Sequence, residues 1–299
     1  MPLFMLAFDH RRSIRGLFGI GGEPTPADAE RIAAAKLLIC EGLLAARERL
    51  TSGAPAVLVD EQYGAAVLDA ARERGIVTAV ACERSGQAEF QLAYGDAFGA
   101  HIERLDPTFV KALVRFNPEG DAELNERQLE RLRTLGDWLA SRGRALLFEL
   151  LVPPEEEQLR AVGGARDRYD AELRPELVGR AVTTIQNAGI EPALWKIEGI
   201  EERSDCELVA AACRRDGRRT VGCLILGRGA DPAKVEHWLR VAAPVDGFQG
   251  FAVGRTIWWE TVAANLAGEL DRGAAVDAIA DRYLHFVDVY DAAASEAQA

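Results

Sequence analysis

The sequence predicts a single-domain α/β protein, a (β/α)8 TIM barrel, from the alternation of its apolar runs, their number and the chain length. Eight short apolar runs are separated by longer stretches, rich in Ala, Glu, Arg and Leu, that have helical periodicity. Short, almost continuously apolar strands that alternate with helices are typical of a parallel sheet covered by helices. The chain has 299 residues, and a closed barrel of eight such units typically needs about 250.

The eight apolar runs are expected to form the strands of one barrel, and the third run is the least distinct of them. In chain order they cover residues 3–8, 55–60, 76–80, 109–116, 145–152, 193–198, 220–226 and 248–253. The helical stretches cover residues 27–50, 65–74, 125–141, 175–188, 232–241 and 261–270. No linker or shorter repeat interrupts the pattern, so we expect one domain over residues 1–291 and a small, polar, frayed tail over residues 292–299.

Composition and charge exclude several classes of protein. With 35 basic and 47 acidic residues the net charge is −12, which is unsuited to nucleic acid because a phosphate backbone needs a basic face. No apolar run is long enough to span a membrane, and Asp9 interrupts the short apolar N-terminus where a signal peptide would continue. Five cysteines at irregular spacing indicate reduced thiols. We therefore expect a cytoplasmic protein that binds neither membranes nor nucleic acid.

Lysine is rare in this chain, and two lysines fall inside predicted strands. Only four of the 35 basic residues are lysines: Lys36, Lys111, Lys196 and Lys234. Arginine cannot lose its proton in a protein, whereas a buried lysine can, and only a neutral amine attacks a carbonyl group. A lysine retained inside an apolar strand therefore indicates either a nucleophile or the partner of a buried carboxylate.

Alternation along the strands predicts which polar side chains enter the barrel. Lys111, Glu149 and Lys196 each alternate with apolar residues that suit the helix-facing side of their strand, and Asp9 follows the first strand. Active sites of such barrels lie at the carboxyl ends of the strands, so we expect these four side chains to converge. Each one alone would also suit a structural role, as an ion-pair partner or a helix cap.

The expected spacing of these groups favours a Schiff-base site. Neighbouring strands lie about 4.8 Å apart, so the fourth and sixth strands are roughly 10 Å apart across the fifth. Lys111 and Lys196 can close that distance, with Glu149 between them. Because burial and mutual repulsion lower a lysine pKa, we expect Lys111 to lower the pKa of Lys196, the nucleophile. Glu149 is then expected to transfer protons.

Glycine and arginine follow the last two predicted strands, where barrels often bind phosphate. Gly227, Arg228 and Gly229 follow the seventh strand, and Gly254 and Arg255 follow the eighth. Glycines let backbone N–H groups approach phosphate oxygens, and an arginine adds a two-point contact. We therefore expect a phosphate site here; the alternative is a pair of turns that carry surface cations.

The sequence offers little for a metal-dependent reaction. The four histidines, His10, His101, His237 and His285, are not paired at HxH or HxxxH spacing, and only His10 falls at a strand end. We therefore expect no metal and no cofactor. A metal-dependent isomerase or lyase remains one alternative function, and a non-catalytic sugar-phosphate-binding barrel is the other. The second would have no need for Lys196.

Six segments occur in the order and spacing of a known family. They are Leu6-Ala7-Phe8-Asp9-His10-Arg11, Val57-Leu58-Val59-Asp60-Glu61-Gln62-Tyr63-Gly64, Val110-Lys111-Ala112-Leu113-Val114, Phe148-Glu149, Trp195-Lys196-Ile197-Glu198 and Gly250-Phe251-Ala252-Val253-Gly254-Arg255. The chain resembles the class I aldolases that include tagatose-bisphosphate aldolase and sulfofructose-phosphate aldolase. It is most similar to the aldolase module of myo-inositol catabolism, which cleaves 2-deoxy-5-keto-gluconate 6-phosphate to dihydroxyacetone phosphate and malonate semialdehyde.

The resemblance implies roles for particular residues and a small sugar phosphate as the ligand. It implies that Lys196 forms the Schiff base, with Lys111 and two acids beside it. The acids are Glu149 and Asp9, and the side chains expected to contact substrate are His10, Arg11, Gln62 and Glu198. The chain departs from the sugar-bisphosphate members at His10, where they carry Gln, and at Arg228, where others carry small residues. These departures bear on the choice of sugar.

Two properties are left open by the sequence. The loops over residues 82–94 and 153–169, which would select the sugar, have no predictable conformation. We expect a homo-oligomer, and Trp258 and Trp259 suit either its interface or a buried position beneath the terminal helix.

Overall fold

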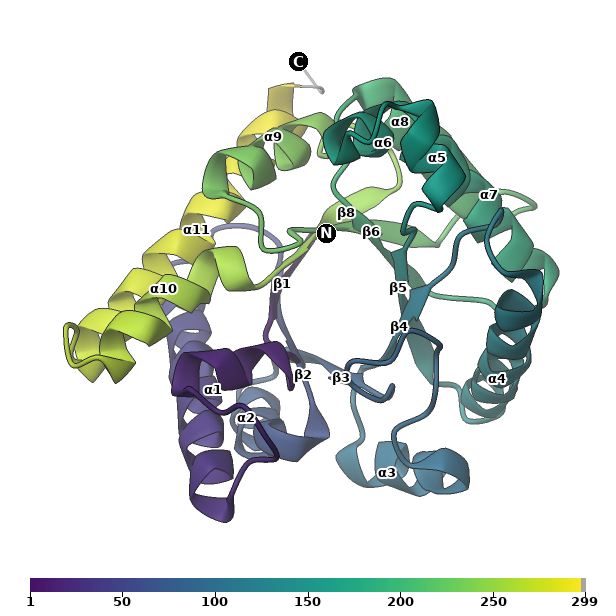
Figure 1. Ribbon diagram of the computed structural model, residues 1–299. Coiled ribbons are helices and arrows are strands. Elements are labelled where there is room, and N and C mark those ends of the chain that lie inside the picture. The colour runs from purple at the N-terminus through teal and green to yellow at the C-terminus, as the bar shows by residue number, and fades with distance from the viewer. Residues whose placement is uncertain (297–299) are drawn as a thin grey trace.

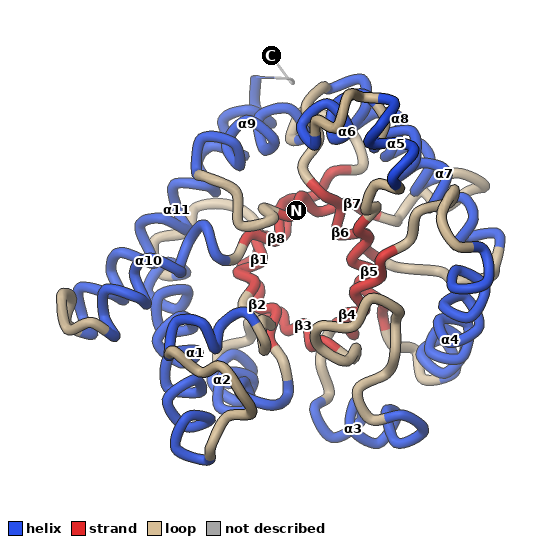
Figure 2. Tube along the Cα trace, in the orientation of Figure 1, coloured by secondary structure: helices blue, strands red, loops and turns tan. Residues whose placement is uncertain are grey.

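The computed structural model describes residues 1–296, in which the strands close into one parallel barrel with helices around its outer surface (Figures 1 and 2). Strand order follows chain order, and β8 closes the ring by pairing with β1. The strands are β1 (Leu3–Ala7), β2 (Ala54–Val59), β3 (Val77–Ala81), β4 (Phe109–Arg115), β5 (Ala145–Leu151), β6 (Leu194–Glu198), β7 (Gly222–Leu226) and β8 (Phe248–Val253). The predicted fold class is confirmed, with every strand within two residues of its predicted bounds.

The helices form the outer layer of the barrel and also line its mouth. They are η1 (Ser13–Phe18), α1 (Pro26–Arg47), α2 (Glu61–Glu73), η2 (Gly95–Ala97), α3 (Phe98–Leu105), α4 (Ala122–Ser141), α5 (Glu156–Ala161), α6 (Arg166–Glu172), α7 (Arg174–Asn187), α8 (Arg203–Arg214), α9 (Pro232–Ala242), α10 (Arg255–Leu266) and α11 (Arg272–Glu296). Within residues 1–296, none of these helices is both long and apolar enough to cross a membrane.

The last two helices differ from the predictions. Helix α10 begins at Arg255 rather than at residue 261, because the N–H of Ile257 already donates to the carbonyl of Gly254 at 2.8 Å. Helix α11 continues to Glu296, through residues expected to be frayed, and its Ala293 is still buried. Residues 297–299 of that expected tail lie outside the described residues.

Apolar side chains fill the barrel below its mouth. The inner cluster consists of Met5, Ala7, Ala56, Leu58, Ala79, Leu147, Leu194, Leu224 and Ala252. Because side chains alternate along a strand, the next inward positions after Ala7, Leu147 and Leu194 belong to Asp9, Glu149 and Lys196. The apolar floor therefore lies directly beneath the polar residues at the carboxyl ends of the strands, as the sequence predicted.

A fully buried ion pair joins α1 to the first two strands. Asp60, which follows β2, caps α2 by accepting a hydrogen bond from the backbone N–H of Tyr63 at 2.9 Å. The ammonium of Lys36, on α1, pairs with the Asp60 carboxylate and donates to the carbonyl of Phe8 at 2.7 Å. Neither charged side chain has any exposed surface, so this lysine has a structural role.

Candidate active site

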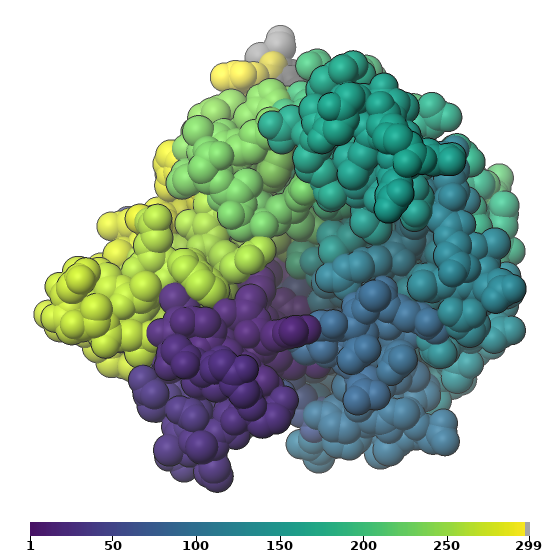
Figure 3. All heavy atoms as spheres, viewed as in Figure 1, coloured from purple at the N-terminus to yellow at the C-terminus, as the bar shows by residue number. Residues whose placement is uncertain are grey.

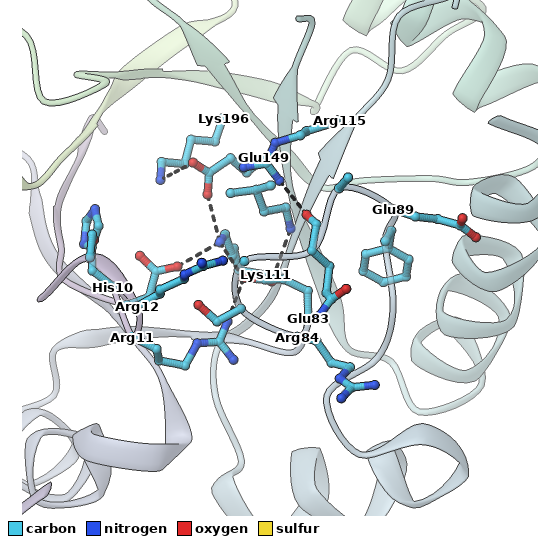
Figure 4. A pocket seen from close by; sticks show the side chains of 18 residues that line it. His10, Arg11, Arg12, Glu83, Arg84, Glu89, Lys111, Arg115, Glu149 and Lys196 are labelled. Atoms are coloured by element: carbon cyan, nitrogen blue, oxygen red, sulfur yellow. Dashed lines mark hydrogen bonds and ion pairs between the residues drawn. The ribbon is translucent and has the colours of Figure 1, made fainter. Parts of the chain in front are cut away.

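A cavity of about 470 Å³ opens at the carboxyl ends of the strands. Its walls come from the segment after β1, the loop between β3 and α3, and the ends of β4, β5 and β6. Figure 3 shows the purple N-terminal segment and the blue β3–α3 segment meeting near the centre of this face. In the close-up, Lys111, Glu149 and Lys196 point into the cavity from neighbouring strands (Figure 4). The structure therefore brings the four predicted core residues, Asp9 included, into one site.

Lys111 lies at the centre of a cluster of three carboxylates. Its ammonium donates to Asp9 Oδ2 at 2.8 Å and to Glu83 Oε1 at 2.9 Å, and it forms an ion pair with Glu149 Oε2 at 2.9 Å. Burial opposes its charge, but Asp9, Glu149 and Glu83 outweigh burial and raise the pKa of Lys111 well above its usual value. Lys111 is therefore a fixed cation.

The fixed charge of Lys111 changes the electrostatic picture expected from the sequence. That picture had two lysines repelling each other in a low-dielectric pocket, with Glu149 between them. In the structure, carboxylates from the ends of three other strands lie within 2.9 Å of the Lys111 ammonium. They compensate the charge of Lys111, which weakens the repulsion expected between the two ammonium groups.

Lys196 differs from Lys111 in that it pairs with one carboxylate within residues 1–296. Its ammonium lies 2.9 Å from Glu149 Oε1, and the two residues are direct neighbours in the β5–β6 register. Glu149 thus contacts both lysines, one through each oxygen. Burial would raise the pKa of Glu149, but Lys111 and Lys196 outweigh it and lower that pKa. Lys196 therefore faces the cavity beside an ionised carboxylate, and it has N–H groups that can bind a ligand.

Glu83 is a member of the cluster that the sequence analysis missed. It contacts Lys111, accepts a hydrogen bond from the backbone N–H of Leu113 at 3.2 Å, and pairs with Arg11 at 3.0 Å. Inward positions on β3 begin at Val77 and Ala79, and every second residue after them leads to Glu83. The third strand was expected to end at residue 80, so this alternation was not followed far enough.

His10 and Asp9 line the same cavity, and they differ in charge. Burial lowers the pKa of His10 to about 4, so its ring is neutral at neutral pH. Its Nδ1 atom has no hydrogen-bond partner among residues 1–296. Burial would raise the pKa of Asp9, but Lys111 and Lys196 outweigh it and hold that pKa well below its usual range. His10 can therefore contact a substrate hydroxyl, while Asp9 remains ionised.

The ring of His10 packs edge-on against Trp258, with 5.6 Å between the ring centroids. Trp258 is fully buried, and its Nε1 donates to the carbonyl of Ala7 at 3.0 Å. Of the two positions considered for this tryptophan, the structure shows the buried one.

Two expected substrate contacts lie outside this cavity. The amide of Gln62 donates to the hydroxyl of Tyr63 at 2.9 Å. Glu198 accepts a hydrogen bond from the backbone N–H of Val152 at 3.0 Å and lies 3.3 Å from Arg228. Alternation was right about the inward direction of Glu198, but neighbouring groups hold its carboxylate. Neither residue lines the cavity that contains Lys196.

The arginines of the expected phosphate site contact other groups of the protein. Arg228 donates to Asp170 at 2.6 Å besides pairing with Glu198, so two carboxylates compensate its charge. Its backbone has a φ of +53°, a left-handed conformation that arginine rarely adopts. Arg255 donates to the carbonyl of Arg228 at 2.9 Å and, with Gly229, lines a separate cavity of about 320 Å³. Arg228 is therefore a poor phosphate ligand in this conformation.

The glycines of the two loops have different surroundings. A Cβ on Gly254 would come within 2.2 Å of the carbonyl oxygen of Ala7 and 3.3 Å of the His10 ring. Gly254 thus lies at the rim next to His10, where only glycine fits. Gly227 packs against Val235 and Val253, and Gly229 lies against the Arg255 guanidinium. None of the three lines the Lys196 cavity.

The described residues contain no cluster of three or more His, Cys, Asp or Glu side chains arranged to hold a metal ion. Three carboxylates do converge, but the Lys111 ammonium occupies the position between them. The other histidines pair with surface acids: His101 with Glu61, His237 with Glu201 and His285 with Glu236.

The fold and the site together define a (β/α)8-barrel protein with a lysine–carboxylate centre at the carboxyl ends of its strands. The chain belongs to the family described as "Uncharacterized protein conserved in bacteria (DUF2090)", whose model matches residues 1–294. No curated protein sequence matches the chain.

Solved structures with the same fold include two named aldolases. An archaeal fructose 1,6-bisphosphate aldolase has 14% identity and a TM-score of 0.57, over 94% of this chain and 93% of that one. Fructose-bisphosphate aldolase from Slackia heliotrinireducens has 14% identity and a TM-score of 0.52, over 93% and 85%. A protein from Corynebacterium glutamicum has 20% identity and a TM-score of 0.56, over 94% and 85%. At these identities the likeness concerns the fold.

Proposed function

We propose that this protein is a class I aldolase that cleaves a phosphorylated keto sugar acid through a Schiff base on Lys196. The observation that carries the proposal is the unequal environment of the two lysines in the cavity. Lys111 is held as a cation by three carboxylates, whereas Lys196 faces the cavity with one carboxylate beside it. The shared fold with fructose-bisphosphate aldolases is compatible with this chemistry.

The reaction begins when the neutral amine of Lys196 attacks the ketone carbon of the substrate. Loss of water from the resulting carbinolamine gives a protonated imine. A base then removes the proton of the hydroxyl group on the second carbon from the imine. The bond between this carbon and the carbon next to the imine breaks. Its electron pair moves into the imine to form an enamine. The aldehyde product leaves, and protonation and hydrolysis of the enamine release the ketone product and free Lys196.

Glu149 is placed to transfer these protons. Its two oxygens contact Lys111 and Lys196, and Oε2 has no hydrogen-bond partner among residues 1–296 despite being buried. An ionised carboxylate that lines the cavity can accept a proton from a bound substrate. Lys111 then keeps Glu149 ionised between turnovers, because its charge lowers the Glu149 pKa.

The substrate we propose is 2-deoxy-5-keto-gluconate 6-phosphate, with dihydroxyacetone phosphate and malonate semialdehyde as products. This choice rests on the sequence resemblance, and on His10 in particular. A neutral imidazole beside Asp9 suits a substrate hydroxyl, and it stands where the sugar-bisphosphate aldolases carry glutamine. Another ketose phosphate would use the same lysine chemistry.

Trapping of the imine tests the proposal directly. Borohydride added with dihydroxyacetone phosphate should inactivate the enzyme and leave a reduced adduct on the peptide that contains Lys196, as read by mass spectrometry. Lys196→Arg should give no adduct, while Lys234→Arg, at a half-exposed lysine paired with Glu201, should behave as the wild type. An adduct on Lys111 would reverse the two roles, and the absence of any adduct would reject the aldolase.

A further inference from the structure

The upper wall of the Lys196 cavity carries three arginines that the chemistry above does not use. Arg12 follows β1, Arg84 follows β3, and Arg115 ends β4. All three line the same cavity as Lys196 (Figure 4). The protein has a net charge of −12, yet three arginines lie around this one opening.

None of these three arginines is paired with a carboxylate in the part of the chain that the structure describes. Arg84 donates to the side-chain oxygen of Gln91 at 3.3 Å, and Arg115 donates to the backbone carbonyl of Gln87 at 2.9 Å. Arg12 has neither a hydrogen bond nor an ion pair within residues 1–296, and its guanidinium lies against Gly86. The positive charge at the rim is therefore uncompensated.

The acids nearby are already occupied. Glu83 contacts Lys111 and Arg11 at the bottom of the cavity. Glu89, in the same loop, is held by Arg127 and Arg131 on α4, and in Figure 4 it points away from the cavity. The cavity thus has two levels: a lower level whose lysines are balanced by carboxylates, and an upper level that lacks anions.

The main chain holds this upper level in place. The bond from Arg115 to Gln87 ties the β3–α3 loop to the end of β4. The N–H of Phe90 donates to the Gln128 side chain on α4 at 2.9 Å, which fixes the other end of the loop. Gly86 has a φ of +76°, and a Cβ there would come within 3.0 Å of Arg12 Cδ and Nη1. A glycine is therefore needed for Arg12 to reach across the opening.

The position of the arginines relative to Lys196 indicates which end of a substrate would meet them. Lys196 lies on β6, and the arginines lie around the β1, β3 and β4 side of the mouth. A ketone bound to Lys196 would have one arm toward β7 and β8 and the other toward these arginines. The second arm would pass over Asp9, Lys111 and Glu149, where the bond would break, and would become the aldehyde that leaves.

We propose that Arg12, Arg84 and Arg115 form an anion-binding subsite for the far end of the leaving aldehyde. The ligand group is a carboxylate or a phosphate, since both accept paired hydrogen bonds from a guanidinium. The assignment rests on the proposed aldolase function and adds to it which residues bind the anionic end of the aldehyde. A positive rim also raises the rate at which such substrates enter the cavity.

Condensation kinetics with three aldehydes test the subsite. Dihydroxyacetone phosphate is combined with malonate semialdehyde, glyceraldehyde 3-phosphate or uncharged glyceraldehyde, and kcat/KM for each aldehyde is measured. Arg12→Gln and Arg84→Gln should each lower kcat/KM by about 10- to 100-fold for an anionic aldehyde, mainly through KM, and leave glyceraldehyde nearly unchanged. The aldehyde with the larger loss identifies the anion as carboxylate or phosphate.

The matched control removes one cation from the opposite end of the barrel. Arg47 is exposed at the last turn of α1 and forms no ion pair within residues 1–296. Arg47→Gln changes the net charge equally and should leave all three aldehydes unaffected. Equal losses for charged and uncharged aldehydes in Arg12→Gln, or no loss for any of them, would overturn the subsite.

Two further measurements separate failure of the subsite from failure of the aldolase. The borohydride adduct with dihydroxyacetone phosphate alone should form equally in wild type and Arg12→Gln, because that probe lacks the aldehyde arm. Malonate binding, measured by calorimetry, should weaken at least about tenfold in Arg12→Gln. Weaker malonate binding in Arg12→Gln, with no adduct in either protein, would support the subsite and reject the aldolase. A normal adduct with unchanged malonate binding would support the aldolase and reject the subsite.

Discussion

Within residues 1–296, Lys36 and Lys196 are both buried lysines that pair with one carboxylate, and Lys196 also lines the cavity described above. Lys36 and Asp60 have no exposed surface, and the remaining polar contact of Lys36 is a backbone carbonyl. Lys196 is 5% exposed, and that small surface faces a cavity of about 470 Å³. Burial of a lysine is thus insufficient to indicate catalysis; what distinguishes Lys196 is room for a carbonyl group beside its amine.

The two sites also treat their charge differently. Burial lowers the pKa of Lys36, with Asp60 opposing that shift. In the other site, one acid is shared between two lysines, and further acids surround only Lys111. The first arrangement suits a fixed link between helix and strands. In the second, a proton can pass between Lys196 and Glu149 without changing the total charge of the cluster.

We expect the largest difference between the two lysines in the turnover of the variants Lys196→Arg and Lys36→Met. Lys196→Arg retains a cation beside Glu149 but cannot form an imine, so turnover should fall to the background rate, by at least about 10³-fold. Lys36→Met should keep the turnover of its folded fraction within about tenfold, because no substrate reaches that position. Formation of dihydroxyacetone phosphate is the measurement, and a Lys196→Arg variant that still turns over would contradict the assignment.

Stability should show the opposite order. Lys36→Met leaves the Asp60 carboxylate buried without its partner, which we expect to cost about 3–5 kcal/mol of unfolding free energy. Denaturant titration measures this loss. Adding Asp60→Asn removes the unpaired charge, so the double variant should recover part of the stability. If the double variant were less stable than Lys36→Met alone, an unpaired Asp60 charge could not be the cause of the loss.

His10, which lines the cavity, should make the stability of the protein depend on pH. Its pKa is lowered to about 4 in the folded protein, whereas a histidine in an unfolded chain titrates near 6.5. The unfolded chain therefore binds the extra proton first as the pH falls. The contribution of His10 is complete above pH ~6.5 and is lost as the pH falls toward 4, by about 3 kcal/mol.

Unfolding free energies measured between pH 7 and pH 4 check this expectation. His10→Gln cannot be protonated and should flatten the loss of stability over that range. Parallel curves for wild type and His10→Gln would show that the ring is not held neutral by its surroundings.

Removal of metal ions should have the smallest effect of all. Because the Lys111 ammonium already occupies the position between the three carboxylates, we expect exhaustive dialysis against EDTA to leave activity unchanged. The same aldol assay measures it. Loss of activity with recovery on addition of Zn²⁺ or Mn²⁺ would reject the Schiff-base mechanism in favour of a metal-dependent one.

Much of the fold, and the core of the site, followed from periodicity. Eight apolar runs predicted eight strands, and side-chain alternation placed Lys111, Glu149 and Lys196 inside the barrel. Glu83 was missed because its strand was expected to end too early. Glu198 was correctly directed inward but is held by Val152 and Arg228, which come from other strands and which no local pattern relates to it.

What the sequence alone determined was the direction of each side chain, because alternation along a strand is a local property of the backbone. The low number of lysines, which is visible in the sequence, also indicated Lys196 as a candidate nucleophile. Only the tertiary structure decided the charge state of Lys111, since that depends on acids contributed by the ends of other strands. Electrostatic effects vary with distances of a few ångströms, and closure of the barrel sets those distances.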